Sequence, residues 1–224
     1  MNWNIVKGAC LALLPVAGTL KAQEKPNIVV ILADDLASNE ISCYGGKNLK
    51  TPNIDRIAEE GIRFTNNFAS CAMSVPIRAS LYTGLYPARH GSYQNHKISY
   101  SDIKSVTYYL PQAGYRVGRA GKTHTVPKSV FNFEKVPGFE ENCIAVTADY
   151  TVDGIRDFMR QDSPFCLFVC STLSHAPWTC GNKDEFDADK VILPPNCVDN
   201  KGTRELFRRL LAEIRALDNQ VGDV

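Results

Sequence analysis

The chain has 224 residues, of which 44% are hydrophobic and eight are cysteine, and its formal net charge is +1. This length and composition suffice for one α/β domain with a buried core. The near-zero charge excludes the broad basic surface that attracts nucleic acid, so an anionic ligand would have to be held by a few placed cations.

The first 22 residues have the layout of a cleavable secretory signal. Lys7 precedes an apolar run over residues 8–20, and Ala22 precedes a polar stretch at 23–25. A short buried helix is the alternative interpretation. We therefore expect a secreted or periplasmic protein. No later apolar run reaches about 18 residues, so we expect no membrane span.

The next elements alternate between strands and helices. Within residues 27–33 every residue after Asn27 is apolar, which is typical of a strand covered on both faces. Thr51 and Pro52 predict a helix through residue 60, which Gly61 ends before a short strand at 62–64. Short helices are expected at 79–83 and 105–113, each followed by glycine. A strand is expected at 115–120.

The second half of the chain continues this alternation. A helix is expected at 150–160, a fully buried strand at 165–170, a loop at 181–202 and an amphipathic helix at 203–217. The pattern predicts an α/β fold with a doubly wound, mostly parallel sheet.

Seven cysteines remain if Cys10 is removed with the signal, so they cannot all pair. Cys180 and Cys197 flank a loop and are the better candidates for a disulfide in an exported protein. Cys166 and Cys170 are four residues apart in a predicted strand. We expect them on one face of that strand as small buried side chains.

Polar residues follow the predicted strands, where ligands bind in doubly wound sheets. Asp34 and Asp35 follow the first strand, Lys122 and His124 a later one, and His175 the strand at 165–170. Two adjacent carboxylates at this position favour a cation, and oxygen ligands suit calcium or magnesium. The alternatives are an aspartate that caps a turn, a solvated lysine and a structural histidine.

Four motifs together resemble the active-site signature of type I sulfatases. They are the Asp34-Asp35 pair, S-V-P-I-R at 74–78 with T-G-L-Y-P-A-R-H-G at 83–91, G-K-T-H at 121–124, and H-A-P-W at 175–178. Ile77 departs from the pattern, because many members carry a small residue there. The similarity covers residues 26–224 and is greatest to the sulfamidase-like and bacterial glycan sulfatases.

The resemblance implies a hydrolase that removes sulfate, as an ester or a sulfamate, from a sulfated glycan such as a heparan-type sugar. By this resemblance, a maturation enzyme oxidises Ser74 to formylglycine, whose hydrate is the nucleophile. Asp34, Asp35 and Ser74 would hold calcium, with magnesium as the alternative.

The remaining site residues are also assigned by resemblance. Arg78 would hold the formylglycine, Lys122 and His124 would bind sulfate and assist proton transfer, and His175 would contact sulfate and protonate the leaving group. His90 would brace the site, and the segment at 92–96 would border the substrate.

The resemblance further implies the alkaline phosphatase and sulfatase type of sheet, with residues 23–224 as the N-terminal portion of a catalytic domain. The family's later Asp-His or Asp-Asn pair is missing, so we expect this chain to be truncated and inactive by itself. Two other functions stay open. One is an alkaline-phosphatase-like phosphohydrolase, and the other is a non-catalytic protein that binds sulfated glycans while Ser74 stays unmodified.

Overall fold

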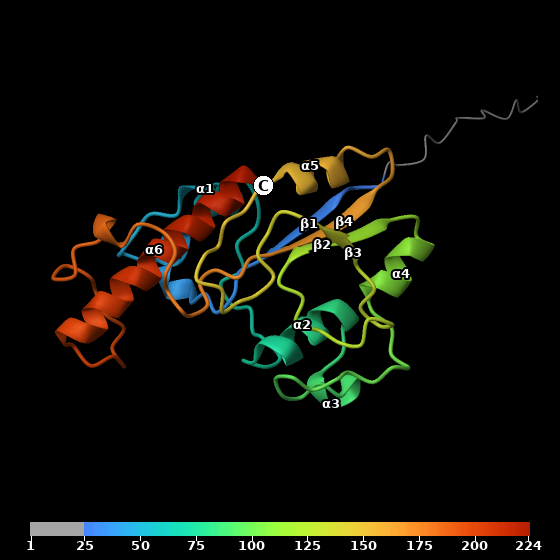
Figure 1. Cartoon of the computed structure of the whole chain (residues 1–224), viewed down its shortest axis with the longest axis horizontal. Coiled ribbons are helices and arrows are strands. Elements are labelled where there is room, and N and C mark those ends of the chain that lie inside the picture. The colour runs from blue at the N-terminus through green and yellow to red at the C-terminus, as the bar shows by residue number, and fades with distance from the viewer. Residues whose placement is uncertain (1–24) are drawn as a thin grey trace, which may run out of the picture.

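The computed structural model describes residues 25–224. Four strands form a parallel sheet in the order β1-β4-β2-β3 (Figure 1). The strands are β1 (Ile28–Leu32), β2 (Arg116–Gly121), β3 (Glu134–Val136) and β4 (Phe165–Cys170). The helices are α1 (Pro52–Glu60), α2 (Ser74–Thr83), α3 (Pro87–His90), α4 (Val106–Gln112), α5 (Asp153–Met159) and α6 (Lys201–Asp223). Three short 3-10 helices are η1 (Ser38–Glu40), η2 (Ser42–Tyr44) and η3 (Lys183–Glu185).

Helices cover both faces of the sheet, as a doubly wound fold requires. β4 is buried along its whole length, and its residues alternate between two hydrophobic clusters. Cys166, Phe168 and Cys170 pack with α2 and α4, whereas the intervening residues pack with α5. The continuous apolar run therefore predicted a central strand correctly, since neither face meets water. It also follows that Cys166 and Cys170 share one buried face.

The register of the strands aligns their carboxyl ends. Cys170 of β4 pairs with Leu32 of β1 on one side and with Gly121 of β2 on the other. The loops that carry the predicted site residues therefore start from one edge of the sheet. Beyond that edge, the Asp34 N–H donates to the Leu173 carbonyl at 2.8 Å, which joins the loop after β1 to the loop after β4.

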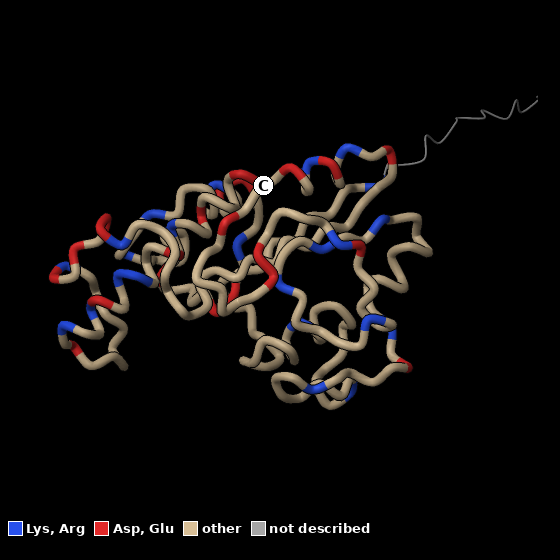
Figure 2. The backbone as a smooth tube through the Cα atoms, viewed as in Figure 1, with Lys and Arg blue, Asp and Glu red and all other residues tan. Residues whose placement is uncertain are grey.

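A third cluster lies outside the sheet. The long helix α6 packs through Phe207, Leu211 and Ile214 against the loop at 181–200. Figure 2 shows positive and negative residues interspersed along α6 and this loop. These charges form ion pairs, such as Arg208 with Asp184 and Lys183 with Glu205.

Several expectations from the sequence were wrong or incomplete. Residues 62–64 form no strand, because they lie in a loop with no neighbouring strand, and Ile62 is 82% exposed. Strand β3 was not predicted, since three residues are too few to show a period of two. α2 begins at Ser74 rather than at residue 79. Pro76 is tolerated in its first turn, because backbone N–H groups there have no hydrogen-bond partner within the helix and the missing N–H of proline costs nothing. α6 extends to Asp223.

The predicted disulfide is absent, because Cys180 and Cys197 are both free thiols. The predicted secretory signal and Cys10 lie outside the described residues. Among residues 25–224, no helix is both long enough and apolar enough to cross a membrane.

Candidate active site

The Asp34 carboxylate is buried between two cations at the end of β1. Its Oδ1 accepts a hydrogen bond from Arg78 Nη2 at 3.2 Å, and its Oδ2 accepts one from Lys122 Nζ. The Asp34 side chain is only 4% exposed, so it is removed from water along with both cations. A buried ion of one sign is costly unless it is paired, and here two cations pair with one carboxylate, so the cluster keeps a formal charge of +1. α2 and β2 thus contribute one cation each to the end of β1.

Ser74 is the first residue of α2, and two side chains contact its hydroxyl. Arg78, one helical turn later, donates from Nε to Ser74 Oγ at 3.2 Å. His124 Nδ1, from the loop after β2, lies 3.1 Å from the same oxygen. Arg78 therefore links Ser74 to Asp34, and the hydroxyl has both a cation and an imidazole within hydrogen-bonding distance.

His124 is adapted to remain neutral. Burial lowers the pKa of His124 below its ordinary value, and the positive charges of Lys122 and Arg78 lower it further. A neutral imidazole whose nitrogen faces a hydroxyl can accept that hydroxyl's proton. His124 also has a positive φ of 40°.

Asp35 and His175 form a looser pair beside this cluster. Asp35 adopts a left-handed backbone (φ 55°), which aspartate tolerates better than most residues, and its side chain is 60% exposed. Its Oδ2 lies 3.7 Å from His175 Nε2. His175 Nδ1 lies 2.5 Å from the Ala176 carbonyl, which can only accept a hydrogen bond. His175 Nδ1 therefore carries the proton, and Nε2 is available toward the two aspartates.

A cavity of about 160 Å³ opens between the end of β1 and α2. Its polar lining comes from Asp34, Asp35, Ser74 and Arg78, and the rest is apolar. Lys122, His124 and His175 do not line it. Lys122 in particular is 2% exposed and faces Asp34, so in this conformation it is placed to hold the carboxylate rather than a ligand.

Three supporting residues could not be assigned from the sequence. Asn95 Oδ1 accepts from the Val75 N–H at 3.0 Å and so satisfies a free donor at the start of α2. Cys143 comes from the loop between β3 and α5, and its thiol lies close to Asp34 and His175. The third is Ser80, whose hydroxyl is 3.1 Å from His90 Nε2. No motif marks Asn95 or Cys143, since only the folded chain brings them near the site.

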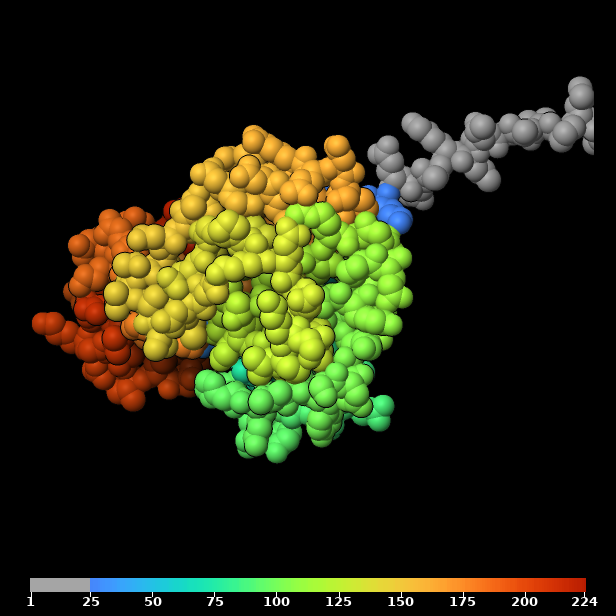
Figure 3. All heavy atoms as spheres, turned by 45° about the vertical axis from the view of Figure 1, so that its right-hand side comes forward, coloured from blue at the N-terminus to red at the C-terminus, as the bar shows by residue number. Residues whose placement is uncertain are grey.

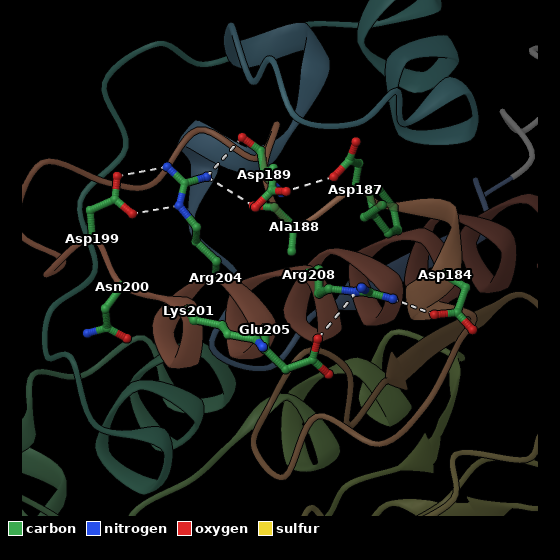
Figure 4. Close-up of a pocket in the computed structure, with 11 residues that line it drawn as sticks. Asp184, Asp187, Ala188, Asp189, Asp199, Asn200, Lys201, Arg204, Glu205 and Arg208 are labelled. Carbon is green, nitrogen blue, oxygen red and sulfur yellow. Dashed lines mark hydrogen bonds and ion pairs between the residues drawn. The ribbon is translucent and has the colours of Figure 1, made fainter.

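Another pocket lies elsewhere and has a different character. It measures about 940 Å³ and lies at the start of α6 (Figure 4). Arg204 pairs there with both oxygens of Asp199 and donates to three backbone carbonyls. Arg208 pairs with Asp184 and Glu205. Because these guanidinium groups are already occupied, we place the candidate site at the smaller cavity.

Comparison with known proteins agrees with the motifs. The sequence model of the Sulfatase family matches residues 26–224. The chain is 38% identical over 161 residues to an ulvan-active sulfatase of Formosa agariphila, covering 69% of this chain and 31% of that protein. It is 34% identical to human N-sulphoglucosamine sulphohydrolase, covering 78% and 36% respectively.

The fold is also shared with a solved structure. The crystal structure of Ps i-CgsB in complex with k-i-k-neocarrahexaose superposes with a TM-score of 0.70 at 23% identity. The match covers 89% of this chain and 54% of that one. The chain therefore spans about a third of the length of the two curated relatives and about half of this structure.

Proposed function

Since this chain belongs to the sulfatase family, we propose that it carries the nucleophile side of an active site that hydrolyses sulfate esters or sulfamates of glycans. The strongest support for this proposal is the environment of the Ser74 hydroxyl. This hydroxyl lies within 3.2 Å of both Arg78 Nε and His124 Nδ1, at a cavity that the two aspartates also line. A hydroxyl between a cation and a neutral imidazole suits attack on an anionic centre.

The residues at the end of β1 fit a hard divalent cation. Asp34 and Asp35 offer carboxylate oxygens, the donors that calcium and magnesium prefer, and both line the cavity beside Ser74. Asp34, Asp35 and Ser74 would hold the ion, which would supply positive charge next to a sulfate oxygen. In the structure, Arg78 and Lys122 both pair with Asp34 and hold its buried carboxylate in place.

Ser74 is also the residue that we propose to be oxidised to formylglycine by a maturation enzyme. The hydrated aldehyde supplies a nucleophile that can release sulfate by re-forming the carbonyl, whereas a serine sulfate ester would be stable. Arg78 Nε then orients the oxygen at position 74, and His124 is placed to accept its proton. His175 stands beside Asp35, at the side of the site where it would protonate a leaving group.

The proposed substrate is a sulfated sugar of the heparan type, outside the cytoplasm. Support comes from the relative named N-sulphoglucosamine sulphohydrolase, which is 34% identical, and from the secretory layout of residues 1–22. The near-zero net charge agrees with recognition by a few placed cations rather than by a broad basic surface.

The test is release of inorganic sulfate from N-sulfated and 6-O-sulfated glucosamine by protein purified from its own host, with glucosamine 6-phosphate as the competing substrate. We expect no release by this chain alone and release by the chain joined to the remainder of a sulfatase domain. In the joined protein, Ser74→Ala should abolish the release, and Ser101→Ala, a change at an exposed turn, should retain it. Faster phosphate release would favour the phosphohydrolase alternative. Binding of sulfated sugar without any release would favour the non-catalytic alternative.

A further inference from the structure

Three potential metal ligands meet beside the cavity in a combination that calcium would not select. A carboxylate oxygen of Asp34, the thiol of Cys143 and a ring nitrogen of His175 all lie within 4.8 Å of one another. Thiolate and imidazole are ligands of zinc and similar metals, whereas calcium takes oxygen. We propose that Asp34, Cys143 and His175 form a zinc site beside the catalytic cavity.

The two ligands at the sheet edge are held in place before metal binds. β1 and β4 pair in register up to Leu32 and Cys170, and the hydrogen bond from Asp34 to Leu173 continues that link into the loops. Asp34 and His175 therefore keep a fixed separation. Each Asp34 oxygen accepts one hydrogen bond and retains a lone pair for a metal.

The hydrogen bond that His175 makes through Nδ1 suits a zinc ligand. Its Nδ1 donates to the Ala176 carbonyl at 2.5 Å, which leaves the lone pair on Nε2. A backbone carbonyl that fixes the tautomer in this way is the usual outer partner of a metal-bound histidine. Nε2 itself has no hydrogen bond among residues 25–224, because Asp35 Oδ2 at 3.7 Å is too distant.

Cys143 supplies the third ligand from the loop at 137–152, which lies on the outside of the molecule (yellow in Figure 3). A turn holds the start of this loop, because the Ala145 N–H donates to the Asn142 carbonyl at 3.1 Å. Ligand atoms around tetrahedral zinc are separated by roughly 3.5 Å. The Cys143 side chain therefore has to move by about 1 Å and to release its proton to solvent.

Zinc bound here would interfere with the proposed calcium site. It would take the Asp34 carboxylate that we propose for calcium, so the two metals would compete. Three protein ligands leave the fourth zinc position open, and water or a substrate group would fill it. The site would thus make the protein sensitive to zinc concentration.

Cobalt binding to the full chain tests the site without any need for turnover, so failure of the sulfatase function can be told apart from failure of this inference. We expect one cobalt ion per chain, with a thiolate-to-cobalt charge-transfer band in the near ultraviolet that zinc abolishes. Cys143→Ser should remove the band, and His175→Gln should weaken binding about tenfold or more. Cys197→Ser, at an exposed thiol, should change neither the charge-transfer band nor the affinity for cobalt. An undiminished band in Cys143→Ser would overturn the proposal.

A second measurement on the unaltered chain avoids any effect of the substitutions on folding. Iodoacetamide labelling, followed by peptide mass mapping, reports the rate at which each thiol reacts. Saturating zinc should slow labelling of Cys143 and leave labelling of the exposed Cys197 unaffected. Equal slowing of both thiols, or of neither, would refute the site.

Discussion

At the residue scale, the buried cations Arg78 and Lys122 both pair with the Asp34 carboxylate. The Lys122 side chain is 2% exposed. Without Lys122 the carboxylate still pairs with Arg78, but its Oδ2 loses its donor, and a buried polar atom left without a partner costs about 1–3 kcal/mol. Lys122→Met should therefore lower the free energy of unfolding by about that amount, as measured by urea denaturation.

Lys135 provides the matched control. It also pairs with a carboxylate, that of Glu141, but its side chain is 74% exposed. Exposed pairs contribute under about 1 kcal/mol, so Lys135→Met should have little effect. Equal losses in the two variants would show that the Asp34 pair is not buried in solution.

Histidine burial gives the protein a predictable response to pH. His90 is fully buried, its Nδ1 accepts from the Ser92 N–H at 3.1 Å and its Nε2 faces the Ser80 hydroxyl. Burial lowers the pKa of His90 below the ordinary 6.5. As pH falls through 6.5, the unfolded chain takes up a proton that the folded chain does not, so stability declines toward acid pH.

His90→Gln should reduce this acid loss of stability. One such group changes the free energy of unfolding by up to about 1.4 kcal/mol per pH unit, and His124 contributes in the same direction. The measurement is urea unfolding between about pH 5 and pH 7. A slope in His90→Gln identical to that of the unaltered chain would count against a neutral buried His90.

At the scale of elements, Gly121 allows the end of β2 to pack closely against the end of β4. It ends β2 with a positive φ of 78°, and a Cβ there would lie 2.1 Å from the Cys170 carbonyl oxygen. Only glycine permits both the conformation and the close approach. The next residue is Lys122, so this glycine also fixes where the cation reaches Asp34.

Gly121→Ala should consequently lower the free energy of unfolding by more than the backbone strain of a positive φ, because the new Cβ also clashes with the Cys170 carbonyl. Gly84 has a similar φ of 71° but nothing within 4 Å of its Cβ position, so Gly84→Ala should cost about 1–2 kcal/mol. We expect at least twice that loss for Gly121→Ala, because the β2 and β4 backbones must separate. Comparable midpoints of thermal unfolding in the two variants would contradict the close packing.

The elements differ in how far their sequence predicts them. β4 was predictable because its six apolar residues are buried on both faces, so its local composition and its environment agree. Residues 62–64 are Ile-Arg-Phe, an apolar and polar alternation that also suits a strand, but they find no neighbouring strand, and strand formation depends on that pairing. The start of α2 at Ser74 depends on tolerance of Pro76 in the first turn.

At the scale of the whole molecule, the register of the sheet assembles the site. Strand ends far apart in the sequence meet because Leu32, Gly121 and Cys170 align, and motif residues therefore gather at one edge. This gathering was predictable from the order of strands and motifs. The resemblance placed the segment at 92–96 near the site, but it predicted neither the hydrogen bond from the Val75 N–H to Asn95 nor the position of Cys143, because both depend on the paths of loops in the folded chain.

The central claim is that Ser74, once oxidised, is the nucleophile of this site. The most direct measurement is the mass of the peptide that spans Ser74, in protein purified from its own host. Oxidation of the alcohol to the aldehyde removes two hydrogens, so we predict a peptide about two mass units lighter than the encoded sequence. A peptide of the encoded mass, with serine intact in all of the protein, would contradict the account.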